Sequence, residues 1–235
     1  MKFFAKDFSE RILKSIEIFS VVLIVLFFLL LNQLFASKPW SSLMVPLAFL
    51  YVPFFVILWR KLDRNRFGLG FPKVDRKKCM DLFRVLVFSF IPFIIGFHIW
   101  QIKIQGFQLH TTSFPSLMAI LSHLFFQFLV VALPEEFFFR TYLQTRLSDI
   151  KIFSREKNKY LVNIFPGGLS AILISNGLFA LTHLIGDVNP VRLLTFFPGL
   201  LFAYLWEKTG QLWIVVLFHA LCNTLLFVLN SIYFS

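Results

Sequence analysis

The sequence predicts an all-α protein, a polytopic bundle of transmembrane helices with about seven spans, six or eight being the alternatives. Two observations lead to this prediction. Hydrophobic residues make up 58% of the 235 residues and charged residues 15%, against roughly 45–50% and about 25% in soluble domains. The apolar residues are also gathered into stretches, most of them near the ~20 residues that a helix needs to cross a bilayer. A soluble domain of this size could not bury that much apolar surface.

Seven apolar stretches carry the predicted spans. They cover residues 16–35, 43–59, 82–100, 117–133, 169–185, 193–206 and 212–233. The first is longer than the roughly 7–15-residue apolar core of a cleaved signal peptide, so we expect a retained helix. With only two Cys and 10 Gly, the chain is neither a disulfide scaffold nor collagen-like.

The basic residues orient the chain. If the N-terminus is cytoplasmic, 20 of the 23 Lys and Arg residues fall on the inner side, many of them in residues 60–84 and 140–159. Only Lys38, Lys103 and Arg192 remain outside. By the positive-inside rule the net charge of +11 is a topology signal rather than a nucleic-acid surface. We therefore expect a multi-pass integral protein of the lipid bilayer, in the cell (inner) membrane if it is bacterial, with no nucleic-acid partner.

The unusual polar residues divide the chain into two parts. Residues 1–112 are expected to hold three transmembrane helices and a basic cytoplasmic connector, residues 60–78. Residues 113–235 hold nearly all polar residues that interrupt apolar sequence, and they are expected to form a four-helix catalytic membrane core. In this part His123 and Gln127, one helical turn apart, are expected to brace the bundle.

A first cluster of charges follows the fourth apolar stretch, in the sequence Pro-Glu-Glu-Phe-Phe-Phe-Arg at residues 134–140. A charge inside a membrane helix costs about 2.5–3.5 kcal/mol on insertion scales, so such residues are functional candidates. Glu136 and Arg140 have the i,i+4 spacing of a helical ion pair, whereas Glu135 points about 100° away. The alternative is an acidic pair at the interface that only caps a helix.

Two further clusters place histidine inside apolar helices. Asn176 lies seven residues before His183, so the two share one helix face. His219 and Asn223 are one turn apart and can point to one place, where the asparagine orients the imidazole or both donate hydrogen bonds to an anion. Each of these residues could instead be a hydrogen-bonding residue that joins two helices.

Together the three motifs, Glu-Glu-x-x-x-Arg, Phe-x-x-x-His and His-x-x-x-Asn, resemble the CPBP family of intramembrane proteases. That family includes the CAAX-processing endoproteases of Ras-converting type and the bacterial Abi proteins. The resemblance covers about residues 117–229 and implies a glutamate-dependent endopeptidase that acts on a membrane-anchored or lipidated protein. The roles that it implies are a base (Glu135), its partner at the water (His183), an oxyanion hole (His219 and Asn223) and supporting residues (Glu136 and Arg140).

Elementary chemistry agrees with these roles. A carboxylate in a poorly solvated cleft is a suitable general base for water, and preorganised donors stabilise the charge on a tetrahedral intermediate. We expect no cofactor. The alternative is a zinc ion held by Glu135, His183 and His219, although no His-Glu-x-x-His signature is present.

A different class of function stays open, namely a non-enzymatic membrane assembly or immunity factor, or a small transporter, that uses the same polar cluster. A transporter would favour two related halves, which this sequence lacks. The enzyme prediction itself carries a geometric difficulty. His183 follows Gly168 by 15 residues, roughly 22 Å of helix, while Glu135 is expected near the inner side. A continuous helix over about residues 116–147 would ease this difficulty.

Overall fold

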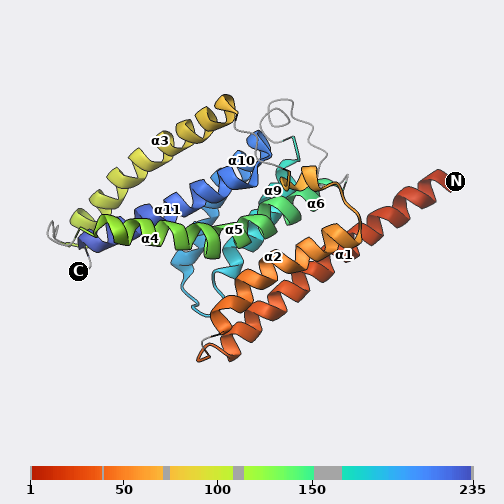
Figure 1. The fold of residues 1–235 in the computed structure, drawn as a ribbon, viewed down its shortest axis with the longest axis horizontal. Helices are drawn as coiled ribbons and strands as arrows, with labels where there is room; N and C mark the ends of the chain where they lie inside the picture. Colours follow the sequence, from red (N-terminus) through yellow and green to blue (C-terminus); the bar gives the residue numbers. More distant parts are fainter. Residues whose placement is uncertain (1, 39, 71–74, 108–113, 151–165, 234–235) are drawn as a thin grey trace. The chain divides into compact units, whose positions relative to one another are not determined.

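The computed structural model describes residues 2–38, 40–70, 75–107, 114–150 and 166–233. All regular secondary structure in these ranges is helical, which confirms the all-α fold class (Figure 1). Every apolar stretch of the sequence coincides with a helix or a helical run. In chain order these are α1 (Lys2–Leu34), α2 (Ser41–Trp59), α3 (Arg76–Ile99), the run Leu117–Ser148, α9 (Leu169–Thr182), α10 (Phe196–Thr209) and α11 (Leu212–Tyr233).

Five helical segments of the described chain are long and apolar enough to cross a membrane. They are Ser9–Leu34, Ser41–Trp59, Arg76–Ile104, Leu117–Ser148 and Leu212–Tyr233. The helices α9 and α10 have 14 residues each, about 21 Å at 1.5 Å per residue, which is short of a ~30 Å hydrocarbon core. The chain is therefore a multi-pass membrane protein, while its seven full spans stay a prediction. Parts of its two inner basic segments, residues 71–74 and 151–159, lie outside the described residues.

The chain forms two compact units. One comprises Met1–Phe71 and Pro134–Leu212, and the other comprises Pro72–Leu133 and Trp213–Ser235. The functional division into residues 1–112 and 113–235 stays a prediction.

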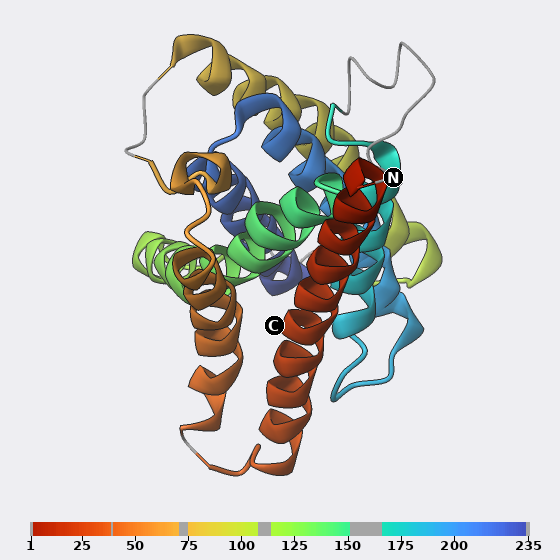
Figure 2. The ribbon, with the colours of Figure 1, turned by 90° about the vertical axis from the view of Figure 1, so that its right-hand side faces the viewer.

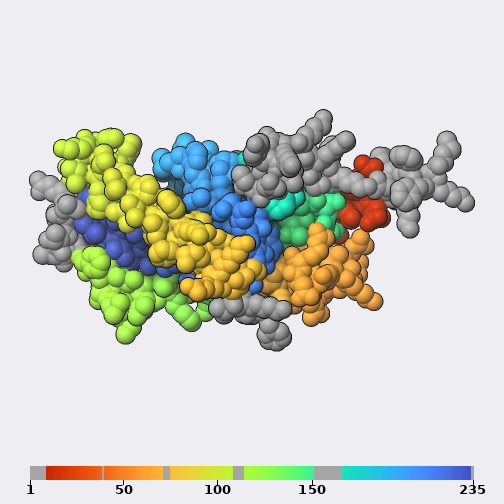
Figure 3. Space-filling view, turned by 90° about the horizontal axis from the view of Figure 1, so that it is seen from above, coloured from red at the N-terminus to blue at the C-terminus, as the bar shows by residue number. Residues whose placement is uncertain are grey.

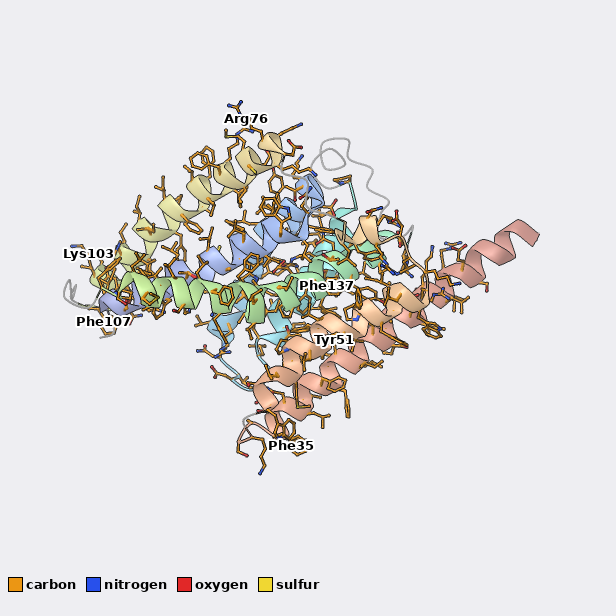
Figure 4. All side chains as sticks on the ribbon, in the orientation of Figure 1. Phe35, Tyr51, Arg76, Lys103, Phe107 and Phe137 are labelled. Atoms are coloured by element: carbon orange, nitrogen blue, oxygen red, sulfur yellow. The ribbon has the colours of Figure 1, made fainter. Side chains whose placement is uncertain are left out.

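In the first unit, α1 and α2 form a helical hairpin (Figure 2). Val21 and Val25 lie one turn apart on α1 and are 2% and 1% exposed, whereas Phe19 is 64% exposed. One stripe of α1 thus faces protein while the opposite stripe faces outward, as expected for a lipid-facing helix. Phe35 marks the end of the hairpin in Figure 4.

The core of the first unit is aromatic. Phe137, labelled in Figure 4, and the two phenylalanines after it are each 3% exposed or less. Phe49 of α2 stacks on Phe138 with a ring distance of 5.2 Å and meets the edge of Phe139 at 5.4 Å. All eight residues of Phe137–Gln144 are buried, the polar Arg140, Thr141 and Gln144 included, so the segment after Glu136 is enclosed by protein on all sides.

An alternating chain of charges joins the hairpin to this core. It consists of Arg60, Glu17, Arg146, Asp149 and Arg66, with nitrogen-to-oxygen distances of 2.5–3.2 Å between neighbours. The Arg146 side chain is only 3% exposed, and its partner Glu17 also accepts a hydrogen bond from the Tyr142 hydroxyl at 3.2 Å. No spacing in the sequence predicts this network, because its members come from distant parts of the chain.

The second unit contains α3, the α4 helix (Leu117–Phe126) and most of α11. Apolar side chains on α3 are widely exposed, Phe88 at 79% and Ile95 at 54% (yellow in Figure 3). The Ser89 hydroxyl donates to the Val85 carbonyl at 2.7 Å, so it leaves no donor facing hydrocarbon. Such a surface suits contact with lipid.

Candidate active site on the buried helical run

The glutamates lie on a helical run with an unusual hydrogen-bond pattern. Helical conformation is continuous over Leu117–Ser148, which confirms the continuity predicted for residues 116–147. After α4 come a π-helical segment η4 (Gln127–Ala132), one α-turn α5 (Leu133–Glu136), a second π-helical segment η5 (Phe137–Gln144) and the α-turn α6 (Thr145–Ser148). Pro134 has no N–H for the regular ladder, and π-helical turns are frequent at functional sites. Both glutamates occupy the α-turn between the two π segments.

Glu136 and Arg140 form the ion pair that their spacing predicts. Arg140 Nε donates to Glu136 Oε2 at 3.2 Å, and both side chains are 0% exposed. Arg140 also interacts electrostatically with Glu135. Two neighbouring carboxylates in a poorly solvated site need such a cation.

Three other side chains hold the Arg140 guanidinium in place. Its Nη2 donates to Asn176 Oδ1 at 3.2 Å, and its Cζ lies 4.8 Å from the centre of the Phe179 ring and 5.8 Å from the centre of the Phe202 ring. A planar, weakly hydrated guanidinium suits this combination of carboxylate, amide and aromatic faces, and a lysine would not replace it.

Asn176 joins three helical segments. Besides accepting from Arg140, its Nδ2 donates to the carbonyl of Phe196 at 2.7 Å, at the start of α10. Gly199, one turn further along α10, leaves room for the Asn176 carboxamide. The sequence placed Asn176 on the face of His183 but gave no sign that Arg140 would be its partner.

Gly199→Ala is expected to lower the thermal midpoint. A Cβ there would overlap the Asn176 carboxamide oxygen and lie 3.1 Å from Arg140 Nη2, and overpacking of this kind costs about 1–3 kcal/mol. Gly177→Ala is the matched control, because a Cβ at Gly177 meets nothing within 4 Å and alanine favours a helix. Equal midpoints for the two variants would contradict the tight contact.

The helix α9 runs antiparallel to the buried run. A Cβ at Gly167 would lie 2.8 Å from Ser148 Oγ, and Ser175 Oγ donates to the Phe139 carbonyl at 2.6 Å. From the first contact to the second, the residue number falls by nine on the buried run, from Ser148 to Phe139. It rises by eight on the other segment, from Gly167 to Ser175, so the two run in opposite directions.

If the same register continues for four more residues, it brings Glu135, four residues before Phe139, level with Phe179, four residues after Ser175. His183 lies one turn beyond. The geometric difficulty of the sequence analysis is therefore relieved, because the helical run continues inward past Arg140 and α9 lies along it.

His183 has a defined orientation in the first unit. Its Nδ1 lies 2.8 Å from the Phe179 carbonyl oxygen, and its ring meets the Phe179 ring at 4.7 Å. A carbonyl only accepts hydrogen bonds, so Nδ1 carries a proton, and in the neutral imidazole Nε2 is then the nitrogen with the lone pair. Phe179 thus contacts both Arg140 and His183.

The second unit holds His219 and Asn223 on α11. Asn223 Nδ2 donates to Gln127 Oε1 at 2.8 Å, and Gln127 Nε2 in turn lies 3.4 Å from His123 Nε2. The predicted brace between His123 and Gln127 is confirmed, and His123 Nδ1 extends it to the Thr224 hydroxyl at 3.3 Å. A carboxamide has two N–H groups, so the bond to Gln127 leaves Asn223 a second one.

The sequence does not reveal that Gln127 orients Asn223. It placed Gln127 one turn from His123, but only the packing of two helices pairs it with an amide on α11. That Glu135, His183, His219 and Asn223 act together on one substrate stays a prediction.

One comparison with known proteins gave a match. The family model described as type II CAAX prenyl endopeptidase Rce1-like matches residues 117–225, which contain all three motifs. This match confirms the resemblance to the CAAX-processing proteases of the CPBP family. No curated protein and no solved structure matches the chain.

Proposed function

We propose that this chain, whose residues 117–225 match the Rce1-like family model of type II CAAX prenyl endopeptidases, hydrolyses a peptide bond in a membrane-associated protein with a water activated by Glu135. The family match supports a membrane-embedded protease in general terms. The activation of water by Glu135 is proposed in addition.

The observation that carries the mechanism is the antiparallel register of α9 on the buried run. Extended by four residues beyond the Ser175–Phe139 contact, this register supports a position of Glu135 level with Phe179, one turn from His183. Glu135 takes a proton from the water, as a carboxylate in a poorly solvated cleft can do. His183 accepts a hydrogen bond at Nε2, because its Nδ1 is occupied by the Phe179 carbonyl, and it thereby orients the same water.

His219 and Asn223 then stabilise the negative oxygen of the tetrahedral intermediate. The bond from Asn223 to Gln127 fixes the carboxamide before the substrate arrives, and fixed donors are the ones that act well in an oxyanion hole. Glu136 and Arg140 support Glu135, since Arg140 interacts with both carboxylates while Asn176 holds its far end.

The substrate is a membrane-anchored or lipidated protein, and the bilayer is the common environment of enzyme and substrate. We place the N-terminus in the cytoplasm, as the uneven distribution of Lys and Arg indicates. The reaction needs no metal in this proposal, and the alternative is zinc held by Glu135, His183 and His219.

Cleavage of a farnesylated CAAX peptide in ¹⁸O-labelled water tests the proposal, with the same peptide lacking the farnesyl group as the matched control. We expect purified protein to release the last residues and leave one ¹⁸O atom in the new terminal carboxyl group, because hydrolysis takes the added oxygen from water, and no acyl-enzyme should accumulate, because in this proposal water attacks directly. The rate should survive exhaustive chelation. Loss of activity on chelation with recovery on added Zn²⁺ would establish the zinc alternative. If neither peptide is cleaved, and the termini of membrane proteins are the same in cells with and without the protein, the chain is not a protease.

A further inference from the structure

The end of α2 has a lysine where helices usually place a glycine. Leu62 N–H donates to the Ile57 carbonyl and Lys61 N–H donates to the Leu58 carbonyl, both at 3.0 Å. These two bonds form a Schellman motif, whose residue in the left-handed conformation is mostly glycine. Here that residue is Lys61, with a φ of 51°.

Elsewhere the chain uses glycine for this conformation. Gly68 after η1 (Arg64–Phe67) and Gly210 after α10 have φ values of 62° and 57°. Within the described residues, Lys61 is the one non-glycine residue with a positive φ. An L-residue with a Cβ is disfavoured there, and strain retained at one place is a reason to look for a function at that place.

The charges around Lys61 are unevenly compensated. Arg60 pairs with Glu17 at 3.2 Å and Arg66 pairs with Asp149 at 2.5 Å. Lys61 and Arg64 form no ion pair with any residue in the described part of the chain. Two of the four cations in residues 60–66 therefore have charge available for a ligand.

These two cations line one cavity. It has a volume of about 260 Å³, and its wall consists of Ile57, Leu58, Lys61, Leu62 and Arg64. The lining thus combines two cationic side chains with three aliphatic ones. It lies at the end of the membrane-spanning segment Ser41–Trp59, where the polar head groups of a bilayer begin.

We propose that this cavity binds the phosphate of an anionic phospholipid. The Lys61 ammonium and the Arg64 guanidinium hold the phosphate oxygens, while an acyl chain lies along Ile57 and Leu58. The aliphatic wall favours a lipid over free phosphate, which has no apolar part. Trp59, 72% exposed at the same end of α2, suits the head-group region as well.

Phosphate binding accounts for the lysine at the left-handed position 61. Glycine at position 61 would relieve the unfavourable φ but remove the ammonium group. The site is independent of the proposed peptidase chemistry, so either can fail alone.

Native mass spectrometry of the full chain in neutral detergent tests the proposal with phosphatidylglycerol, phosphatidylcholine and inorganic phosphate as separate probes. We expect phosphatidylglycerol to bind more tightly than phosphatidylcholine. Lys61→Gln and Arg64→Gln should each weaken phosphatidylglycerol about fivefold, the equivalent of about 1 kcal/mol per basic residue near an anionic surface. Lys77→Gln, which removes an exposed charge elsewhere in the same basic segment, should leave the affinity unchanged.

Lys61→Gly separates strain from binding. In phosphatidylcholine nanodiscs it should melt a few degrees above the wild type, about 2–4 °C, yet phosphatidylglycerol should stabilise it less than the wild type. Equal weakening by all three glutamine variants would overturn the site in favour of a diffuse basic surface. Competition by inorganic phosphate at the affinity of the lipid would overturn the lipid assignment.

Discussion

Glu135→Gln is expected to lower the rate of peptide hydrolysis by about 10²–10⁴-fold, the usual contribution of a general base, while the protein stays folded. The amide has the shape of the carboxylate but cannot accept the proton of the water. The Glu136–Arg140 pair, at 3.2 Å, is left intact, so no buried charge loses its partner. The measurements are the initial rate on the cleaved peptide and the thermal midpoint in detergent.

Glu10→Gln is the matched control for this experiment. Glu10 pairs with Lys14 on α1 and its side chain is 60% exposed, so the same chemical change there should alter neither the rate nor the midpoint. A Glu135→Gln protein that hydrolyses the peptide at the wild-type rate would rule out Glu135 as the base. Loss of both rate and midpoint would point to a structural carboxylate instead.

Arg140→Ala is expected to destabilise the protein strongly. The variant leaves Glu136 as an uncompensated charge at 0% exposure, and breaking a buried pair in this way costs about 3–5 kcal/mol. At roughly 2–4 °C per kcal/mol for a chain of this size, the midpoint should fall by roughly 6–20 °C. Activity should fall as well, because the segment that carries Glu135 loses its anchor to Asn176.

Two variants show whether the effect comes from burial. Arg192→Ala breaks a pair with Asp187 whose side chains are 47% and 55% exposed, and it should cost under about 1 kcal/mol. The double change of Glu136→Leu and Arg140→Met removes both charges and should regain most of the lost stability. If Arg140→Ala melts like Arg192→Ala, the pair is hydrated and the buried assignment is wrong.

The features that could be predicted from the sequence are those within a single helix, namely its location and the side-chain pairs along it. The pairs Glu136 with Arg140 and His123 with Gln127 follow from the i,i+4 spacing, which every helix imposes, and both are present. Apolar stretches likewise located the helices. The limits of the helices were less certain, since α3 begins at Arg76, six residues before its apolar stretch, because helical hydrogen bonds continue beyond the part that lipid covers.

Contacts between helices could not be predicted. The seven-residue spacing predicted that Asn176 shares a helix face with His183, but the bond of Asn176 to Arg140 depends on the position of α9 along the buried run. The same holds for Asn223 with Gln127 and for Glu17 with Arg146. Such pairs join different helices, so their prediction requires the packing of the helices, which the spacing of residues in one sequence does not show.

The two π-helical segments also explain why spacing along the sequence misleads here. A hydrogen bond from residue i to i+5 encloses one more residue than an α-turn, so η5 changes the angular phase of everything after it. Deleting one residue from Phe137–Gln144 would permit a regular α-helix and keep both motif glutamates. Because the π-turn takes up the extra residue, that deletion would leave Arg146 close to its present direction toward Glu17, whereas the same deletion from a regular α-turn would rotate it by about 100°. The protein therefore sets the directions of its charges by an irregular winding as well as by their order in the chain.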